Sequence, residues 1–194
     1  MKTLPANARG FTLIELLISI AILAIIVLQA VPAFREFSER SQTRTVTNQL
    51  IGYLNYARAQ AIHENHSVII CSSSNGKTCR WSRNWSGKKI MVYVDINNDN
   101  RFKQNDDRLL QVSESLPEGS HLRLKVFRNK PYIKWLSTGM TDSQQGNFTY
   151  CPPSRDMTNA RHIIWNVSGR VYDGLDSNGD GIVEDDRNRN IRCR

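Results

Sequence analysis

An unbroken apolar run near the N-terminus constrains this chain more than any other feature. Residues 11–31 (FTLIELLISIAILAIIVLQAV) contain a single charged side chain, Glu15. As an α-helix the run spans about 30 Å, the thickness of the hydrocarbon core of a bilayer. Lys2 and Arg9 precede it, and this asymmetry keeps residues 1–10 in the cytoplasm. The run is too long for an ordinary secretory signal. We therefore predict one membrane-spanning helix, with the remaining residues outside the cytoplasm.

Glu15 is the unusual residue of this run. A carboxylate within a membrane segment is costly, and such groups commonly have a functional partner. The simpler interpretation is a side chain that reaches the membrane interface.

The residues around Glu15 favour the functional interpretation. The segment Arg9-Gly10-Phe11-Thr12-Leu13-Ile14-Glu15-Leu16 resembles the processing site of type IV pilins and of the pseudopilins of type II secretion. The resemblance implies that prepilin peptidase cleaves between Gly10 and Phe11, and that Phe11 is then N-methylated. It also implies that Glu15 pairs with the freed amino terminus of a neighbouring major or minor pilin in a filament.

The segment after the apolar run keeps a helical period to about residue 65. Pro32 ends the apolar run, and a proline inside a helix removes one backbone hydrogen bond. Apolar residues then recur at three- and four-residue steps, which predicts an amphipathic helix whose apolar face lies against a sheet. That face carries Val46, Leu50, Tyr53, Leu54, Ala57 and Ala61, and the opposite face carries Arg44, Thr47, Asn48, Asn55 and Arg58.

Beyond residue 65 the apolar period changes to two, which predicts short strands separated by Gly, Asn, Ser and Pro clusters. Antiparallel hairpins packed on one helix give an α+β head. The expected strands are 67–71, 90–95, 109–112, 122–127, 132–136, 148–151, 162–167 and 170–172.

The head also resembles a known group. Val68-Ile69-Ile70-Cys71, a short loop to Cys79, and a second strand ending at Asp95 with Asn97 after it are similar to the GspH/FimT subfamily. This resemblance implies the type IV pilin fold, a long N-terminal helix packed on an antiparallel β-sheet head. The expected organisation is a cleaved leader (1–10), a transmembrane and filament-core helix (11–31), its amphipathic continuation (32–65) and a β-rich head with a C-terminal tail (66–194).

Four cysteines suit two disulfides in a domain outside the cytoplasm. Sequence spacing leaves all three pairings open. We expect Cys71 with Cys79, which closes a small loop, and Cys151 with Cys193, which ties the tail to a strand. Members of this family that act in type II secretion usually lack cysteine pairs. The resemblance therefore favours the pilus branch for this chain.

The chain has a net charge of +8, which suits an anionic partner but also simple solubility. Some FimT-like pilins are DNA receptors in natural transformation and use arginines around a Gly-Arg-x-Arg motif. Here Gly169-Arg170 keeps the first half, and Tyr172 replaces the second arginine. Six carboxylates between Asp173 and Asp186 offset the tail arginines. The candidate DNA-binding residues are Arg155, Arg161, Arg170, Arg187, Arg189, Arg192 and Arg194.

The acidic tail contains a partial calcium-loop motif. Asp176, Asn178, Asp180 and Glu184 place oxygens at alternate positions, as in a calcium loop. The twelfth position is Arg187, so the full EF-hand pattern fails. The same residue types also form turns without metal. Ca²⁺ is the one cofactor that the sequence suggests.

No catalytic motif is present in the sequence, and we expect no enzyme activity. The resemblance implies a minor pilin that supports pilus assembly and is a candidate DNA receptor for natural transformation. Its expected location is the inner membrane, crossed once with the head in the periplasm, and then the surface pilus. The alternative is a GspH-like pseudopilin of a type II secretion system.

Overall fold

A computed structural model describes residues 12–193 of the chain. A single helix, α1 (Leu13–Glu64), includes Pro32 in its interior, so the proline does not end it. The chain divides into two compact units, Met1–Arg40 and Ser41–Arg194. The boundary between them falls within α1.

The described part of the first unit is entirely helical from Leu13 onward. By length and composition α1 qualifies to cross a membrane. Its large apolar side chains from Leu13 to Phe37 are all exposed. An apolar surface this extensive is not stable in water, so it needs lipid or other apolar helices as partners.

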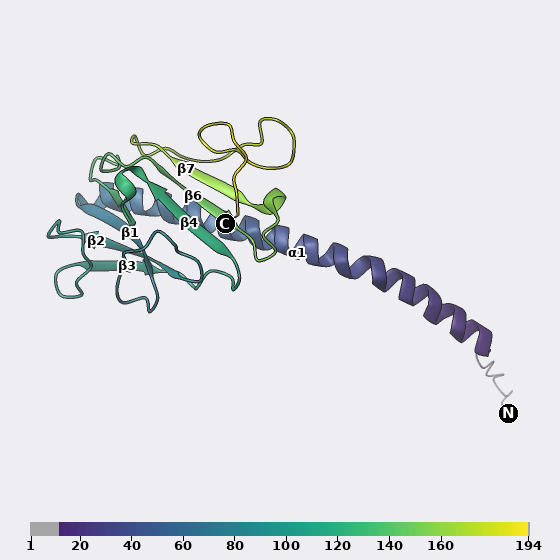
Figure 1. Cartoon of the computed structure of the whole chain (residues 1–194). Helices are drawn as coiled ribbons and strands as arrows, with labels where there is room; N and C mark the ends of the chain where they lie inside the picture. The colour runs from purple at the N-terminus through teal and green to yellow at the C-terminus, as the bar shows by residue number, and fades with distance from the viewer. Residues whose placement is uncertain (1–11, 194) are drawn as a thin grey trace, which may run out of the picture. The chain divides into compact units, whose positions relative to one another are not determined.

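The second unit contains the rest of α1 and eight strands (Figure 1). Each strand expected from the two-residue period is present, with ends shifted by no more than two residues. The strands are β1 (Ser67–Ser73), β2 (Lys89–Asp95), β3 (Arg108–Val112), β4 (His121–Val126), β5 (Tyr132–Trp135), β6 (Gly146–Cys151), β7 (Arg161–Trp165) and β8 (Val171–Asp173). Two 3-10 turns, η1 (Phe127–Asn129) and η2 (Met157–Asn159), lie between them.

The strands form two four-stranded antiparallel sheets. Sheet A has the order β3-β2-β1-β5, and sheet B has the order β4-β6-β7-β8. In sheet A, β1 is paired on both sides, with Val68 opposite Val94 of β2 and Trp135 of β5. In sheet B, β4 is an edge strand, and His121 lies opposite Cys151 of β6.

One hydrophobic core joins α1 to both sheets. The helix contributes Leu50 and Leu54, sheet A contributes Val92, and sheet B contributes Phe148 and Trp165, all buried. In sheet A the alternate residues form a second cluster on the other face, around Met91 and Tyr93. Sheet A is therefore covered on both faces, which explains the nearly continuous apolar runs of β1 and β2.

The apolar face of the second half of α1 is confirmed, with one correction. Val46, Leu50, Leu54, Ala57 and Ala61 are buried, and Tyr53 is partly buried. Thr47, expected on the opposite face, is also buried. Its hydroxyl donates to the carbonyl of Thr43 at 2.9 Å, so the polar group is satisfied inside the helix and its methyl group can pack.

Two disulfides join the four cysteines. Cys71 is bonded to Cys79, and Cys151 is bonded to Cys193. The second bond attaches the C-terminal tail to β6. Around it, Val183 and Ile191 pack with Cys151 and Ala160 in a small separate core. The tail therefore has its own apolar anchor on sheet B besides the covalent bond.

Candidate functional site

The first candidate site is the start of α1. The backbone N–H of Thr12 donates to Glu15 Oε2 at 3.2 Å, and the backbone N–H of Glu15 donates to Thr12 Oγ1 at 3.3 Å. This reciprocal pair is a capping box, which satisfies backbone donors that a helix start leaves free. Glu15 remains exposed, so the same carboxylate that caps its own helix can meet a second group.

The processing site lies outside the described residues. Gly10 and Phe11, between which cleavage is predicted, precede residue 12. Cleavage and N-methylation therefore remain predictions from the motif.

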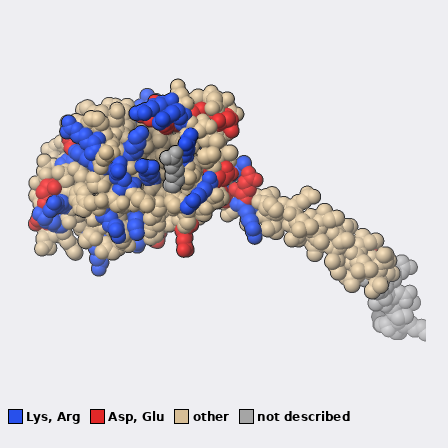
Figure 2. Space-filling view, viewed as in Figure 1, with Lys and Arg blue, Asp and Glu red and all other residues tan. Residues whose placement is uncertain are grey.

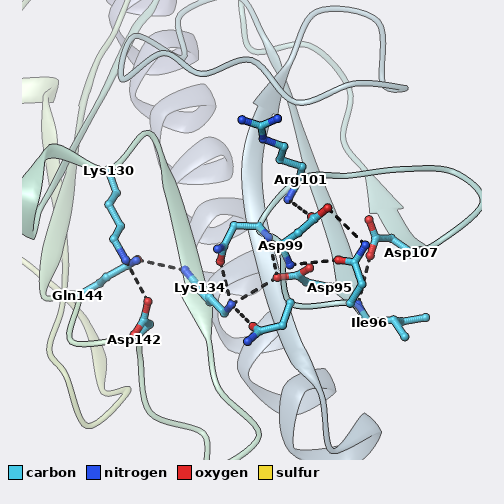
Figure 3. Close-up of polar contacts among 12 residues, drawn as sticks. Asp95, Ile96, Asp99, Arg101, Asp107, Lys130, Lys134, Asp142 and Gln144 are labelled. Atoms are coloured by element: carbon cyan, nitrogen blue, oxygen red, sulfur yellow. Dashed lines mark hydrogen bonds and ion pairs between the residues drawn. The ribbon is translucent and has the colours of Figure 1, made fainter.

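The second candidate site is the turn after β2, where the structure places a buried ion pair (Figure 3). Lys134 Nζ lies 3.3 Å from Asp95 Oδ2, with the two side chains 6% and 0% exposed. The same ammonium donates to Asn100 Oδ1 at 2.8 Å and to Asn98 Oδ1. Three side-chain oxygens surround the ammonium, much as they would surround a small bound cation. Lys134 therefore fixes the turn that follows Asp95 in the way a bound cation would.

A second carboxylate organises the rest of this turn. Asp107 accepts from the backbone N–H of Ile96 at 3.1 Å and from that of Lys103 at 2.8 Å. Burial raises the pKa of Asp107, although these backbone hydrogen bonds act in the opposite direction. The turn is thus a structural element closed by its own carboxylates and by Lys134 of β5.

The structure gives no support to calcium at the acidic tail loop. Within residues 12–193, no three Asp, Glu, His or Cys side chains lie close enough together to hold one metal ion. Asp176 instead accepts from the backbone N–H groups of Gly179 and Gly181, and Glu184 accepts from those of Ser177 and Asn178. In the structure, these carboxylates are the hydrogen-bond acceptors of a turn.

The third candidate site is the basic surface of the head. Figure 2 shows Lys and Arg side chains gathered on the face that carries β4 and β6, close to the C-terminal end of the chain. A cleft of about 630 Å³ lies on sheet B beside the tail, and we call it the tail cleft. Of the arginines expected to bind DNA, Arg189 and Arg192 line it.

The other expected arginines within residues 12–193 are not among the lining residues. Arg155, Arg161, Arg170 and Arg187 do not line the tail cleft. Arg155 contacts His121 Nε2 at 3.3 Å, and Arg161 donates to the carbonyl of Ala160 at 2.8 Å. Arg194 lies outside the described residues.

Sequence reasoning missed the residues of β4 that line this cleft. Arg123 and Lys125 alternate with the buried Leu122 and Leu124, so they point away from the core. The alternation was visible in the sequence, since a half-buried strand with basic residues at every second position has one basic face.

The charges in the tail cleft are partly compensated. Arg189 donates to Asp185 Oδ2 at 2.7 Å, and this hydrogen bond lowers the pKa of Asp185 to about 2. Asp185 is therefore ionised at neutral pH. Burial lowers the pKa of His162, so this imidazole in the cleft lining is neutral near pH 7.

Comparisons with known proteins identify the class of this chain. The profile of the type II transport protein GspH matches residues 46–169, and that of the prokaryotic N-terminal methylation motif matches residues 5–28. No curated protein matches the chain in sequence.

Two solved structures of one minor pilin show the same fold. The type IV minor pilin FimU of Pseudomonas aeruginosa is similar with a TM-score of 0.52 and 14% identity, over 68% of this chain and 92% of that one. A second crystal form of FimU is similar with a TM-score of 0.51 and 15% identity, over 72% of this chain and 92% of that one. The minor pseudopilin EpsH of the Vibrio cholerae type 2 secretion system has a TM-score of 0.48 and 11% identity to this chain, over 68% of this chain and 95% of that one.

The long helix, the antiparallel sheets and the methylation motif define a pilin-type subunit with a membrane anchor. Such subunits are structural proteins that assemble with other pilins, and the chain is not an enzyme. More specifically, the chain belongs to the GspH family, whose profile covers most of its length.

Proposed function

We propose that this protein is a minor pilin of a type IV pilus. The observation that carries the proposal is the start of α1, where an apolar surface without a partner begins beside an exposed carboxylate. In the proposal, prepilin peptidase cuts between Gly10 and Phe11, and the head lies in the periplasm until residues 11–31 leave the inner membrane for the filament. Inside the filament Glu15 pairs with the amino terminus of a neighbouring pilin.

Substitution of Glu15 tests this proposal. Glu15→Gln keeps a side-chain acceptor for the capping box but removes the charge, whereas Glu15→Val removes both. Removal of one partner from a buried ion pair costs about 3–5 kcal/mol, so both variants are expected to enter pili at least about tenfold less than the unmodified protein. The measurement is the ratio of the protein in sheared pili to that in the membrane.

The glutamine variant decides which role of Glu15 matters. If Glu15→Gln enters pili normally while Glu15→Val does not, helix capping and not ion pairing explains the residue. Equal membrane levels of all three proteins are the required control.

The alternative is a GspH-like pseudopilin of a type II secretion system, and it has the same fold. The two disulfides support the pilus assignment. Cross-linking in cells separates the two: pilins as the captured neighbours support the proposal, and secretion pseudopilins as the captured neighbours overturn it.

We also propose a second function, the binding of double-stranded DNA for uptake in natural transformation. The arginines that line the tail cleft support this function, because they are exposed and hold their charge at any physiological pH. The mature full-length protein in non-ionic detergent is expected to bind a labelled duplex without sequence preference. Affinity should fall by at least about tenfold between roughly 50 and 200 mM salt, because bound phosphates release counterions. No binding at about 50 mM salt would remove this function.

A further inference from the structure

The tail cleft is built from parts that are far apart in the sequence. Its floor is the outer face of sheet B, where Arg123 of β4 lies opposite Thr149 of β6, and Thr149 lies opposite His162 of β7. Thr149 Oγ1 is 3.2 Å from His162 Nδ1, which joins the two side chains across the strands. One wall comes from the tail, which contributes Arg189 and Arg192.

The tail is held in place beside this floor. The disulfide of Cys193 joins it to Cys151 of β6, and the backbone N–H of Ile191 donates to the carbonyl of Val183 at 3.0 Å. Ile191 itself is buried. Arg189 and Arg192 therefore extend from a fixed backbone, which reduces the entropy lost when they bind a ligand.

Positive charge dominates the lining. Arg83, Arg123, Lys125, Arg189 and Arg192 line the tail cleft, and Asp185 is the carboxylate among its lining residues. Asp185 is already paired with Arg189. Asp186 lies 4.0 Å from Lys125, and both of these side chains are more than half exposed, so this second pair is weak. The cleft therefore keeps cationic groups that can bind an anion.

A second hollow adjoins the tail cleft, and the residues that it adds to the lining are Ser82, Asn84, Ser86 and Leu122. This hollow of about 420 Å³ lies at the edge of β4 and shares Arg83, His121 and Arg123 with the tail cleft. The edge of β4 is held there by the segment that carries Arg83, whose carbonyl accepts from Leu124 N at 2.9 Å. Arg83 and Arg123 therefore lie where two hollows meet, and such an extended depression matches a linear polyanion better than a single small anion.

The side chains in the lining also indicate which kind of polyanion fits the two hollows. None of the residues that line these two hollows is Phe, Tyr or Trp. Sites for single-stranded nucleic acids rely on such side chains to stack on the bases, whereas contacts to phosphates need only cationic and polar groups. The hollows thus suit the sugar-phosphate backbone of a duplex.

We propose that the tail cleft and the adjoining hollow form a binding groove for the phosphodiester backbone of double-stranded nucleic acid. This proposal rests on the second function proposed above, the binding of double-stranded DNA. It assigns that binding to Arg123 and Lys125 of β4, together with Arg83, Arg189 and Arg192. Arg170 and Arg187 are not among its lining residues.

Two double variants of the mature full-length protein in detergent test the groove. Arg123→Gln with Lys125→Gln removes two charges inside it. Arg170→Gln with Arg187→Gln removes two exposed charges outside it and is the matched control. The probe is a fluorescently labelled duplex of about 24 base pairs, with its single strand as a second probe, measured by anisotropy across a salt series. Tryptophan fluorescence checks that each variant is folded.

In the groove variant, duplex affinity is expected to fall at least about tenfold, and the slope of log affinity against log salt should shrink by about two. In the control, affinity is expected to stay within about threefold. The unmodified protein should bind the duplex more tightly than the single strand.

The outcomes separate the groove from the function on which it rests. If the unmodified protein does not bind the duplex, DNA binding fails and the groove fails with it. If it binds, but the groove variant binds equally well or the control loses as much affinity, the groove is overturned while DNA binding stands. Tighter binding of the single strand also overturns the groove.

Discussion

Lys134→Met is expected to lower the free energy of unfolding of the head by about 3–5 kcal/mol. Methionine fills similar space but leaves the carboxylate of Asp95, which is 0% exposed, without its counter-charge. Removal of one member of a buried ion pair has a cost of this size, because the remaining charge stays in a medium that solvates it poorly. The asparagine oxygens of the turn also lose their shared donor.

The head carries a convenient probe for this measurement. All four tryptophans lie between residues 81 and 165, so a urea titration followed by tryptophan fluorescence reports the head and not the apolar half of α1. The titration uses the mature protein in a non-ionic detergent.

An exposed ion pair in the same turn is the matched control. Lys103 Nζ lies 2.6 Å from Asp99 Oδ2, but these side chains are 52% and 30% exposed. Lys103→Met is expected to cost less than about 1 kcal/mol. Adding Asp95→Asn to Lys134→Met should recover part of the loss, because the two residues are coupled. Equal losses in Lys134→Met and Lys103→Met would contradict a stabilising role for the buried ammonium.

Removal of the Cys151–Cys193 disulfide is expected to be the second large effect. Its cysteines are separated by 42 residues, and on the chain-entropy estimate a loop of this length contributes about 4 kcal/mol. The double variant Cys151→Ala with Cys193→Ala should lose about this much in the same urea titration. The tail arginines also lose their covalent anchor, so duplex affinity should fall if the proposed groove is the binding site.

The other disulfide supplies the comparison. Cys71 and Cys79 are separated by 8 residues, for which the same estimate is about 2.5 kcal/mol. Cys71→Ala with Cys79→Ala should therefore cost less, unless the loss of buried Cys71 from the core adds to it. DNA affinity should not change in this variant, because the loop it closes is not part of the groove lining. A larger effect on DNA affinity here than at Cys151 and Cys193 would contradict the role given to the tail.

Much of the secondary structure could be predicted from local patterns. The helical period after Pro32 and the eight two-residue periods each arise within one segment, and the structure confirms all of them. The polar side chain of Thr47 predicts exposure, but Thr47 lies on the buried face of α1. A hydroxyl that bonds back to its own helix does not need water, and a sequence period does not show this.

The acidic motifs show the limit of reading short sequence patterns. The loop from Asp176 has oxygen-bearing side chains at alternate positions, as calcium loops do, and the turn after Asp95 is also rich in Asp and Asn. In the structure, backbone N–H groups donate to Asp176 in the first, and Lys134, which is 39 residues from Asp95, donates to Asp95 Oδ2 in the second. The partner in the second turn could not be identified from the motif itself.

Local sequence chemistry was sufficient for the apolar anchor with its carboxylate, for the processing motif and for the strands, because each depends on residues within one short segment. The division into two sheets, the ammonium that Lys134 brings to Asp95 and the basic groove between β4 and the tail depend on strand pairing and on a disulfide. These join residues tens of positions apart, and the free energy that selects them comes from burying the shared core, which no single segment contains.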